Sequence, residues 1–494
     1  MANDSIQKSV FPRVLLALLI LIVFARFASL SLYPMLGTTE PRYAELARKM
    51  LVLGDWVTLW VTDGVPLWGK PPLSFWADAA SMAVFGINEF GARFAPFCAS
   101  LLTLSLFWFW RGSRLLSTPA LIAALIYLST PMGFLGTGFV ATDVYLTGGL
   151  ALSMISFWRV MQANVSRPST PQPATFWHWG FFIGIAIGLL AKGPLSVVLL
   201  GLSMLLWIAI SPKERLLTTW RILPWLRGTA LTLLLAMPWY LWAEHRTPGF
   251  LYHFIIGEHI ERFLVKGWNG GRFAPSHAEN LGMIWWFFIE SFVPWTLFVI
   301  PALFGLQKTK NTLGQWRYGT TVAHYFKSSE VQYLLSWILS SLLLFTLSRN
   351  ILEAYVLPTL PAFAILLAEA ITKLIKNHKA WRWSLLLALA APIVIMIVVL
   401  FFNDNLEKQS QRHLLRNWQK NTPLIYVGKV MPPSAIFYSS NQAQLKTTLD
   451  DVTSQPVTVV MEGVSFDALP VATQAEWIMI ERYDDFIMLH SHPK

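Results

Sequence analysis

The chain of 494 residues is 55% hydrophobic and 14% aromatic, whereas only 13% of its residues are charged. Soluble globular proteins contain about 25% charged residues, so this composition excludes a soluble globular enzyme, a collagen and a disordered chain. The single cysteine, Cys98, excludes a disulfide framework, and the net charge of +11 suggests membrane topology before it suggests nucleic acid.

The predicted elements begin with an apolar run, Val14–Leu32, which we interpret as a retained first membrane helix because no small-residue cleavage site ends it. The stretch Tyr33–Arg93 is polar and aromatic, and its short amphipathic pieces predict helices that lie along the membrane surface. Further apolar runs are long enough to cross a bilayer. They lie at residues 94–110, 119–136, 143–160, 177–190, 194–210, 229–243, 283–305, 331–347, 354–372 and 384–402, which predicts about 11–13 transmembrane helices.

The charges of the loops predict an orientation, because short cytoplasmic loops concentrate Lys and Arg. With the N-terminus in the cytoplasm, the predicted inner loops are rich in Lys and Arg and poor in acids. The opposite loops are balanced, and residues 33–93 hold five basic and six acidic residues. An odd number of spans then places the C-terminal tail outside.

Residues 403–494 differ in kind, with eight basic and ten acidic residues. Short alternating runs predict strands at Leu424–Val427, Ala435–Tyr438, Val457–Met461, Trp477–Glu481 and Phe486–His490, and the piece Asn441–Asp451 is compatible with a helix. The sequence therefore predicts two domains. Residues 1–402 form a membrane domain with juxtamembrane helices in the loop 33–93, and residues 403–494 form a small α/β domain.

Acids, bases and aromatic residues converge on the predicted outer face, where an ionisable group beside lipid indicates function. They are Glu40, Arg42, Tyr43, Glu45 and Lys70 in the first loop, Asp143 and Lys192 at the ends of predicted spans, and Arg349 and Tyr355 at a later boundary. The carboxylates could take a proton from an acceptor, and the cations could hold an anionic headgroup. This pattern predicts a lipid-phosphate substrate.

Each of these residues also has a structural interpretation. Glu40 and Arg42 fit a helix cap with a surface pair, Lys70 fits a headgroup anchor, Asp143 fits a helix N-terminus, and Tyr355 fits an aromatic belt. The acids around His259 suggest a metal site, but their spacing favours a solvated helix face.

Several motifs carry a resemblance in their order and spacing. They are Thr39-Glu-Pro-Arg-Tyr-Ala-Glu45, Gly54-Asp-Trp56, Gly69-Lys-Pro-Pro72, Phe85-Gly86, Thr142-Asp143, Ala191-Lys-Gly-Pro194, Glu258-His-Ile-Glu-Arg-Phe263 and Tyr355-Val-Leu-Pro358. Over most of the membrane part, the chain resembles bacterial 4-amino-4-deoxy-L-arabinose (lipid A) transferases, which are relatives of the protein O-mannosyltransferases. The resemblance implies an all-α polytopic membrane protein with the C-type glycosyltransferase fold and a small C-terminal periplasmic α/β domain.

The same resemblance implies a reaction and a set of site residues. A sugar would move from a polyprenyl (undecaprenyl) phosphate, usually with inversion, to an acceptor such as lipid A. The family's acidic pair, Asp-Glu, is Thr39-Glu40 here, so Glu40 and Asp143 are the predicted catalytic residues. The predicted substrate and lipid-phosphate contacts are Arg42, Tyr43, Lys70, Lys192, His259, Arg262, Arg349 and Tyr355.

The resemblance also bears on metals. A glutamate that helps to hold zinc in these enzymes is Gly69 here, so His259 would retain at most half of that site. A divalent metal is left open, but neither a bound metal nor a required cofactor is predicted.

Other functions stay open at this point. They are a protein O-glycosyltransferase of the mannosyltransferase type, a flippase or transporter of a polyprenyl-linked sugar, and a scaffold for a periplasmic partner. The expected partners are the lipid-linked donor, a glycolipid or protein acceptor and membrane lipids, without nucleic acid. The expected location is the bacterial inner membrane, with the N-terminus cytoplasmic and the C-terminal domain periplasmic.

Overall fold

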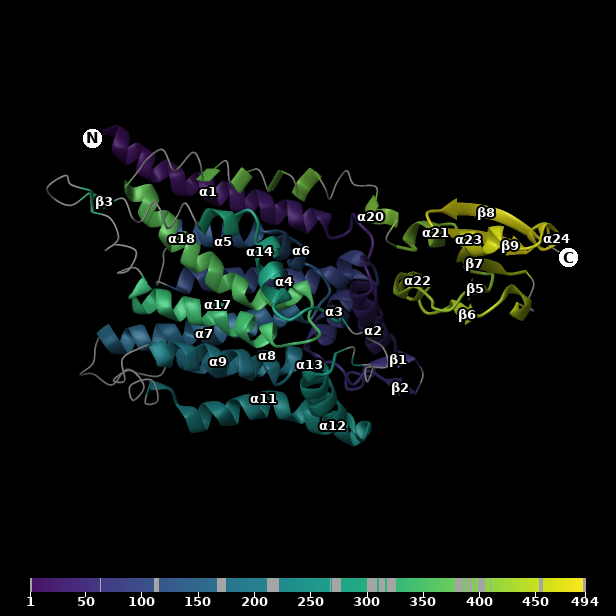
Figure 1. Cartoon of the computed structure of the whole chain (residues 1–494), viewed down its shortest axis with the longest axis horizontal. Coiled ribbons are helices and arrows are strands. Elements are labelled where there is room, and N and C mark those ends of the chain that lie inside the picture. Colours follow the sequence, from purple (N-terminus) through teal and green to yellow (C-terminus); the bar gives the residue numbers. More distant parts are fainter. Residues whose placement is uncertain are drawn as a thin grey trace.

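The computed structural model of the chain describes residues 2–62, 64–110, 115–166, 175–210, 222–266, 268, 277–299, 309–310, 316–317, 326–377, short pieces between 385 and 398, 405–408, 410–452 and 456–491. Long helices run side by side along the longest axis of the molecule (Figure 1). A small domain that contains a β-sheet lies at one end of this bundle, and the N-terminus lies at the other end.

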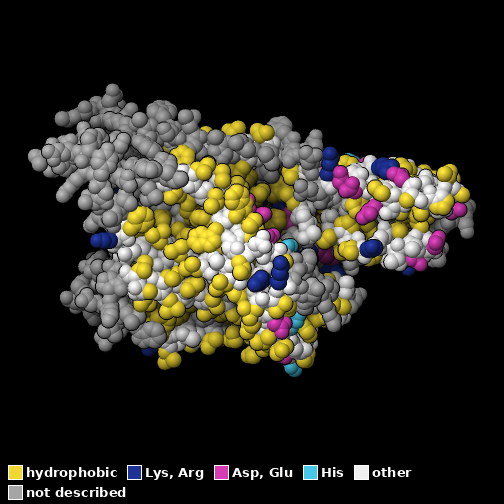
Figure 2. All heavy atoms as spheres, in the orientation of Figure 1, with side chains coloured by type: hydrophobic (Ala, Val, Ile, Leu, Met, Phe, Trp, Pro, Cys, Tyr) yellow, Lys and Arg dark blue, Asp and Glu magenta, His cyan; other side chains and the backbone are white. Residues whose placement is uncertain are grey.

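The bundle consists of apolar helices. They are α1 (Ala2–Ser29), α4 (Glu89–Trp110), α5 (Thr118–Leu128), α6 (Pro131–Gly136), α7 (Asp143–Ser166), α8 (Phe176–Lys192), α9 (Leu195–Ile210), α11 (Trp225–Arg246), α14 (Met283–Ser291), α17 (Ser329–Thr346) and α18 (Leu360–Asn377). Within the described ranges, four segments are long and apolar enough to cross a membrane: Val10–Ser29, Glu89–Trp110, Asp143–Asn164 and Glu353–Lys373. On the face shown in Figure 2, hydrophobic side chains cover much of the described surface of the bundle, and large hydrophobic residues are exposed on several of its helices. Such a surface requires lipid around it, so the chain is an integral membrane protein.

Two predicted spans differ from the structure. The predicted span 119–136 is broken, because α5 ends at Leu128 and α6 begins after Thr130, whose side chain caps it by accepting from Gly133 N at 3.0 Å. Pro131 is the first residue of α6 and lacks an N–H group, so a continuous helix is disfavoured there. The predicted span 283–305 contains α14, which ends at Ser291. The predicted span 384–402 lies largely outside the described residues, and the number of 11–13 helices stays a prediction.

Short elements fill the first predicted outer loop and the segment after α11. The loop contains α2 (Thr39–Leu53), the strands β1 (Trp60–Thr62) and β2 (Val65–Pro66), and α3 (Leu73–Phe85), so its predicted helices are confirmed. The later segment contains α12 (Phe250–Tyr252), the π-helix η1 (His253–Glu261) and α13 (Arg262–Leu264). The strands β3 (Thr309–Lys310) and β4 (Trp316–Arg317) form a hairpin, and the 3-10 helix η2 (Glu353–Thr359) precedes α18. In Figure 1, α2, β1, β2 and α13 lie at the end of the bundle that faces the small domain.

The small domain is built on a five-stranded sheet in the order β6-β5-β7-β9-β8. The strands are β5 (Leu424–Val427), β6 (Gln444–Lys446), β7 (Thr458–Glu462), β8 (Trp477–Tyr483) and β9 (Phe486–Ser491). The first three are parallel, and β9 and β8 continue the sheet in antiparallel fashion. Its helices are α20 (Asn405–Lys408), α21 (Arg412–Arg416), α22 (Pro433–Tyr438), η3 (Leu449–Asp451), α23 (Gly463–Asp467) and α24 (Val471–Gln474).

Two elements of this domain were predicted wrongly. The run Ala435–Tyr438 belongs to helix α22, which begins at Pro433, a residue that favours the first helical position. A short apolar run cannot be assigned to helix or strand from its periodicity alone. The piece Asn441–Asp451 holds the strand β6 and the three-residue 3-10 helix η3 in place of one continuous helix.

A buried ion pair joins the first loop to the bundle. The side chains of Glu40 in α2 and Arg93 in α4 are both 0% exposed. Arg93 donates from Nε to Glu40 Oε1 at 2.8 Å and from Nη2 to Glu40 Oε2 at 2.7 Å. Its other N–H groups donate to the carbonyl oxygens of Leu30, Tyr33 and Pro34. Arg93 therefore holds the connector between α1 and α2 against α4.

We expect Glu40→Gln to destabilise the fold by about 3 kcal/mol, because it leaves the buried guanidinium of Arg93 without a counter-charge. Thermal or denaturant unfolding of the purified protein in detergent micelles measures the effect. Asp467→Asn is the matched control, since it removes a carboxylate from an exposed pair with Arg482 and should leave the unfolding midpoint unchanged. Equal midpoints for the two variants would contradict a structural role for the buried pair.

Candidate active site

Two adjoining cavities lie among α2, α7, the end of α8, η1–α13 and η2. The larger has a volume of about 490 Å³ and the smaller about 80 Å³. Lys70, Lys192, Arg262 and Tyr355 line both cavities. The other charged side chains of the larger cavity are Arg42, Asp143, Glu279 and Glu353, and its apolar wall includes Met132, Leu135, Phe139, Phe287 and Leu357. The site therefore combines cations and carboxylates with a hydrophobic wall.

Asp143 and Lys192 face each other at the junction of the cavities. Asp143 is the first residue of α7 and Lys192 is the last residue of α8, so two helix ends bring the charges together. Lys192 Nζ donates to Asp143 Oδ1 and lies 4.4 Å from the ring centroid of Tyr355. Gly193 ends α8 with a φ of +73°, and a Cβ at this position would lie 2.5 Å from the ring of Phe254. Only glycine allows this close packing of the helix end.

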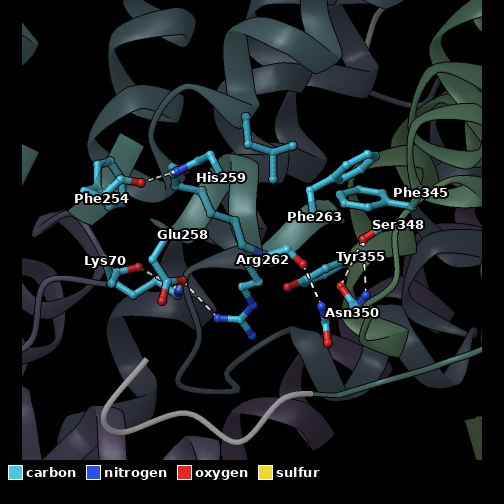
Figure 3. A pocket seen from close by; sticks show the side chains of 13 residues that line it. Lys70, Phe254, Glu258, His259, Arg262, Phe263, Phe345, Ser348, Asn350 and Tyr355 are labelled. Carbon is cyan, nitrogen blue, oxygen red and sulfur yellow. Dashed lines mark hydrogen bonds and ion pairs between the residues drawn. The ribbon is translucent and has the colours of Figure 1, made fainter. Parts of the chain in front are cut away.

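A second cluster joins Lys70, Glu258 and Arg262, as Figure 3 shows. Glu258 Oε2 lies 3.5 Å from Lys70 Nζ and accepts from Arg262 Nη1 at 2.9 Å. Burial would raise the pKa of Glu258, but the charges of Lys70 and Arg262 lower it below its ordinary value. Burial would likewise lower the pKa of Lys70, but Glu258 raises it. Glu258 is thus an ionised carboxylate held between two cations.

The backbone around this cluster is fixed by neighbouring segments. Gly69 leaves room for Glu258, since a Cβ at residue 69 would lie 3.2 Å from its Oε1. Asn350 Nδ2 donates to the carbonyl oxygens of Arg262 at 2.6 Å and Val265 at 2.8 Å. The turn that carries Arg262 is therefore tied to the segment between α17 and η2.

The structure brings most of the predicted site residues together. Those that line a cavity are Arg42, Tyr43, Lys70, Asp143, Lys192, His259, Arg262 and Tyr355. Glu40 lines neither cavity, because its carboxylate is enclosed by Arg93 and accepts from Leu36 N at 2.8 Å.

Arg349 also lies outside both cavities, contrary to the expectation of a cavity contact. Its side chain is exposed, while its backbone N–H donates to Phe263 O at 3.3 Å and its carbonyl accepts from Glu279 N at 3.2 Å. Its neighbours Ser348 and Asn350 line the smaller cavity instead.

Sequence reasoning missed several polar lining residues: Glu258, His277, Glu279, Asn350 and Glu353. The interpretation of the acids around His259 as a solvated face was wrong for Glu258, whose side chain is 6% exposed. Lys70 and Glu258 each lie in a motif that carries the resemblance, and this was the available signal. The two residues are 188 positions apart, so the sequence does not show that they meet.

The side chains present do not fit the zinc site that the resemblance implies. His259 Nδ1 lies 2.7 Å from Phe254 O and Nε2 lies 3.2 Å from Lys192 O, so both ring nitrogens face backbone carbonyls. Gly69 has no side chain and supplies no ligand at the position where the family has a glutamate. Within the described part of the chain, no group of three or more His, Cys, Asp and Glu side chains could hold a metal ion.

Comparisons with known proteins agree with this architecture. The profile of the dolichyl-phosphate-mannose-protein mannosyltransferase family matches residues 12–254. The undecaprenyl phosphate-alpha-4-amino-4-deoxy-L-arabinose arabinosyl transferase of Edwardsiella ictaluri is 28% identical over 373 residues, which cover 73% of this chain and 60% of the relative. The enzyme of the same name from Pseudomonas aeruginosa is 28% identical over 403 residues, which cover 78% of this chain and 65% of the relative. The chain thus spans less than two thirds of the length of these relatives.

A solved structure shares the fold over nearly the whole chain. ArnT from Cupriavidus metallidurans bound to undecaprenyl phosphate superposes with a TM-score of 0.71 at 17% identity, covering 97% of this chain and 99% of that chain. Its structure in the apo state gives a TM-score of 0.69. The chain therefore has the fold of ArnT and is related in sequence to the arabinosyl transferases and to the protein mannosyltransferase family.

Proposed function

We propose that the chain is an inner-membrane glycosyltransferase that moves a sugar from a polyprenyl (undecaprenyl) phosphate to lipid A or another glycolipid. The observation that carries this proposal is the convergence of Lys70, Lys192 and Arg262 with Asp143 on one cavity. The names of the similar arabinosyl transferases and the undecaprenyl phosphate bound to ArnT support the donor class. The match to a protein mannosyltransferase profile makes a protein the alternative acceptor.

The three cations shared by the two cavities are the proposed phosphate site. Among the described residues, the hydrogen bond from the Arg262 guanidinium to a side chain goes from Nη1 to Glu258, so its remaining N–H groups are available to phosphate oxygens. Lys70 and Lys192 each hold one carboxylate partner that a phosphate could replace. The same positive charges would stabilise the phosphate as it leaves in the transition state.

Asp143 is the proposed carboxylate that meets the acceptor. When Lys192 turns to the donor phosphate, Asp143 is released to orient an acceptor oxygen or to take its proton. The acceptor oxygen then forms a bond to the anomeric carbon as the bond from that carbon to the phosphate oxygen breaks. The electron pair stays on the polyprenyl phosphate, and the configuration inverts. Glu40 would act indirectly by holding α2, which carries Arg42 and Tyr43 on the cavity wall.

The proposed topology places this cavity and residues 403–494 on the periplasmic side. The charge distribution of the loops supports it, since Lys and Arg are concentrated in the predicted cytoplasmic loops while the opposite loops are charge-balanced. The predicted division into a membrane domain, 1–402, and a periplasmic domain, 403–494, is part of the same proposal. The helices α2 and α13 lie at the end of the bundle that faces the small domain (Figure 1), and both carry residues that line the larger cavity. In the proposed topology, a donor headgroup and a lipid acceptor would therefore meet at one membrane surface.

Asp143→Asn should lower kcat for transfer of labelled sugar from a synthetic polyprenyl-phosphate donor to lipid A in proteoliposomes by about 100-fold or more. Donor KM should change less, because the asparagine keeps the size of the side chain. Glu40→Gln is the comparison, and its folded fraction should retain a much higher kcat. If Glu40→Gln were inactive while Asp143→Asn stayed active, Glu40 would be the carboxylate that meets the acceptor and Asp143 would have the indirect role.

Lys70→Gln and Arg262→Gln should each weaken binding of polyprenyl phosphate by about 10- to 100-fold, as expected for the loss of one charged hydrogen bond. Binding of a fluorescent polyprenyl phosphate to the protein in nanodiscs measures this loss. Arg349→Gln is the matched control, because the side chain of Arg349 is exposed and outside both cavities. A similar loss in the control would argue against a specific phosphate site.

Glu258 should give the protein a pH-dependent stability. Its folded-state pKa lies below the ordinary 4.5, so its contribution is present above about pH 4.5 and is lost as the pH falls through the folded-state value. Wild type should therefore unfold at a higher temperature than Glu258→Gln at about pH 6, and the difference should shrink in acid. Thermal unfolding across a pH series measures it, and a constant difference would exclude this role.

A further inference from the structure

The connector between α1 and α2 is held almost entirely by side chains from other elements. Besides the three carbonyls that Arg93 binds, the carbonyl of Leu32 accepts from Arg412 Nη2 at 3.1 Å. The N–H of Met35 donates to Tyr438 Oη at 2.8 Å, and the N–H of Leu36 donates to Glu40. This segment has no regular structure of its own, so its shape depends on these partners.

Two of the partners belong to the C-terminal domain. Arg412 is the first residue of α21, and Tyr438 is the last residue of α22. Both also bind Glu89 at the start of α4, with Arg412 Nη1 at 3.0 Å and Tyr438 Oη at 2.9 Å from Glu89 Oε1. A single carboxylate oxygen on the bundle therefore receives two donors from the domain.

The contact also has an apolar part that continues to the cavity. Phe437 is 4% exposed and belongs to the same hydrophobic cluster as Met35, Tyr43 and Phe75. The rings of Tyr43 and Phe75 lie 5.3 Å apart, and Tyr43 lines the larger cavity. One packed cluster thus connects the C-terminal domain to a cavity wall.

We propose that the C-terminal domain is required for efficient sugar transfer. Tyr438, Arg412 and Phe437 are positioning residues that act through α2. Their contacts fix the connector and thereby fix Arg42 and Tyr43 on the cavity wall. This inference rests on the proposed glycosyl transfer. In the described part of the chain, the hydrogen bonds of Lys70, Lys192 and Arg262 go to residues outside the C-terminal domain, so donor binding and transfer should respond differently to changes in the domain.

Tyr438→Phe and Phe437→Ala test the proposal in the full-length protein in proteoliposomes. We expect each to lower kcat by about 10-fold, because small displacements of positioning groups cost large factors in rate. Donor KM should stay within about twofold, since the phosphate cations lie on other elements. Hydrogen exchange of residues 30–50 should become faster in both variants.

Tyr426→Phe is the matched control. Tyr426 is also a buried tyrosine of the C-terminal domain, but its hydroxyl donates to Gln411 within the same domain, at 3.2 Å. We expect Tyr426→Phe to have the wild-type kcat and the wild-type rate of hydrogen exchange in residues 30–50. Glu89→Gln combined with Tyr438→Phe should lower kcat by less than the product of the two single effects, because both changes remove the same contact.

A wild-type kcat in both Tyr438→Phe and Phe437→Ala would overturn the inference. An equal loss of kcat in Tyr426→Phe would also overturn it, because it would indicate a general destabilisation of the domain. If the wild-type protein transfers no sugar, the proposed function fails instead. In that case, hydrogen exchange still tests whether the domain fixes the connector. Unchanged protection of residues 30–50 in Tyr438→Phe would show that the domain does not fix the connector.

Discussion

The guanidinium of Arg93 is fully buried and keeps its charge under all ordinary conditions, so the chain must satisfy it where it lies. Its five N–H groups make five hydrogen bonds, two to Glu40 and three to backbone carbonyls of the connector. Its Cζ also lies 3.8 Å from the ring centroid of Tyr33. Arg93 therefore fixes the bundle side of the connector through which the first helix leads into α2. Arg42 and Tyr43 lie in the first turns of α2, so their positions depend in part on this anchor.

The cations of the cavity are also paired with carboxylates, but these pairs are less enclosed than the pair of Arg93 and Glu40. Lys192 is paired with Asp143, and Lys70 and Arg262 share Glu258, so no cation of this group is buried without a counter-charge. These pairs reduce the cost of burying charge beside lipid. They also differ from the Arg93 pair, because their side chains border open volume. In the proposed function, a phosphate replaces a carboxylate at this open volume, whereas the partners of Arg93 are enclosed with it and are not accessible to a ligand.

Charge itself was the signal for part of the cavity lining. Lys70, Asp143 and Lys192 stand out because ionisable residues are rare in so apolar a chain, whereas Arg262 was predicted from the resemblance, and all four line the larger cavity. The pairings could not be predicted, since Lys70 meets Glu258 across 188 residues and Glu40 meets Arg93 across 53. Glu40 was predicted to be catalytic because the resemblance matches it to the family's acidic pair, but a sequence motif does not show that the carboxylate is paired with Arg93. In the C-terminal domain, β5, β7, β8 and β9 followed from alternation, whereas α22 did not, because a short apolar run after Pro432 and Pro433 fits either conformation.

The hydrogen bonds of the connector suggest why a site in the membrane bundle would depend on the C-terminal domain. The helices α2 and α13, which carry cavity residues, lie at the end of the bundle that faces the C-terminal domain (Figure 1), and the connector before α2 contains no helix or strand. Arg93 fixes the carbonyls of the connector from within the bundle, but Leu32 O and Met35 N face the other way and receive their partners from Arg412 and Tyr438. Without those partners the two groups would have to be satisfied by water, which would loosen the segment that precedes α2. The geometry of the cavity thus depends on contacts from both sides of the connector, one set inside the bundle and one set on the domain that closes its end.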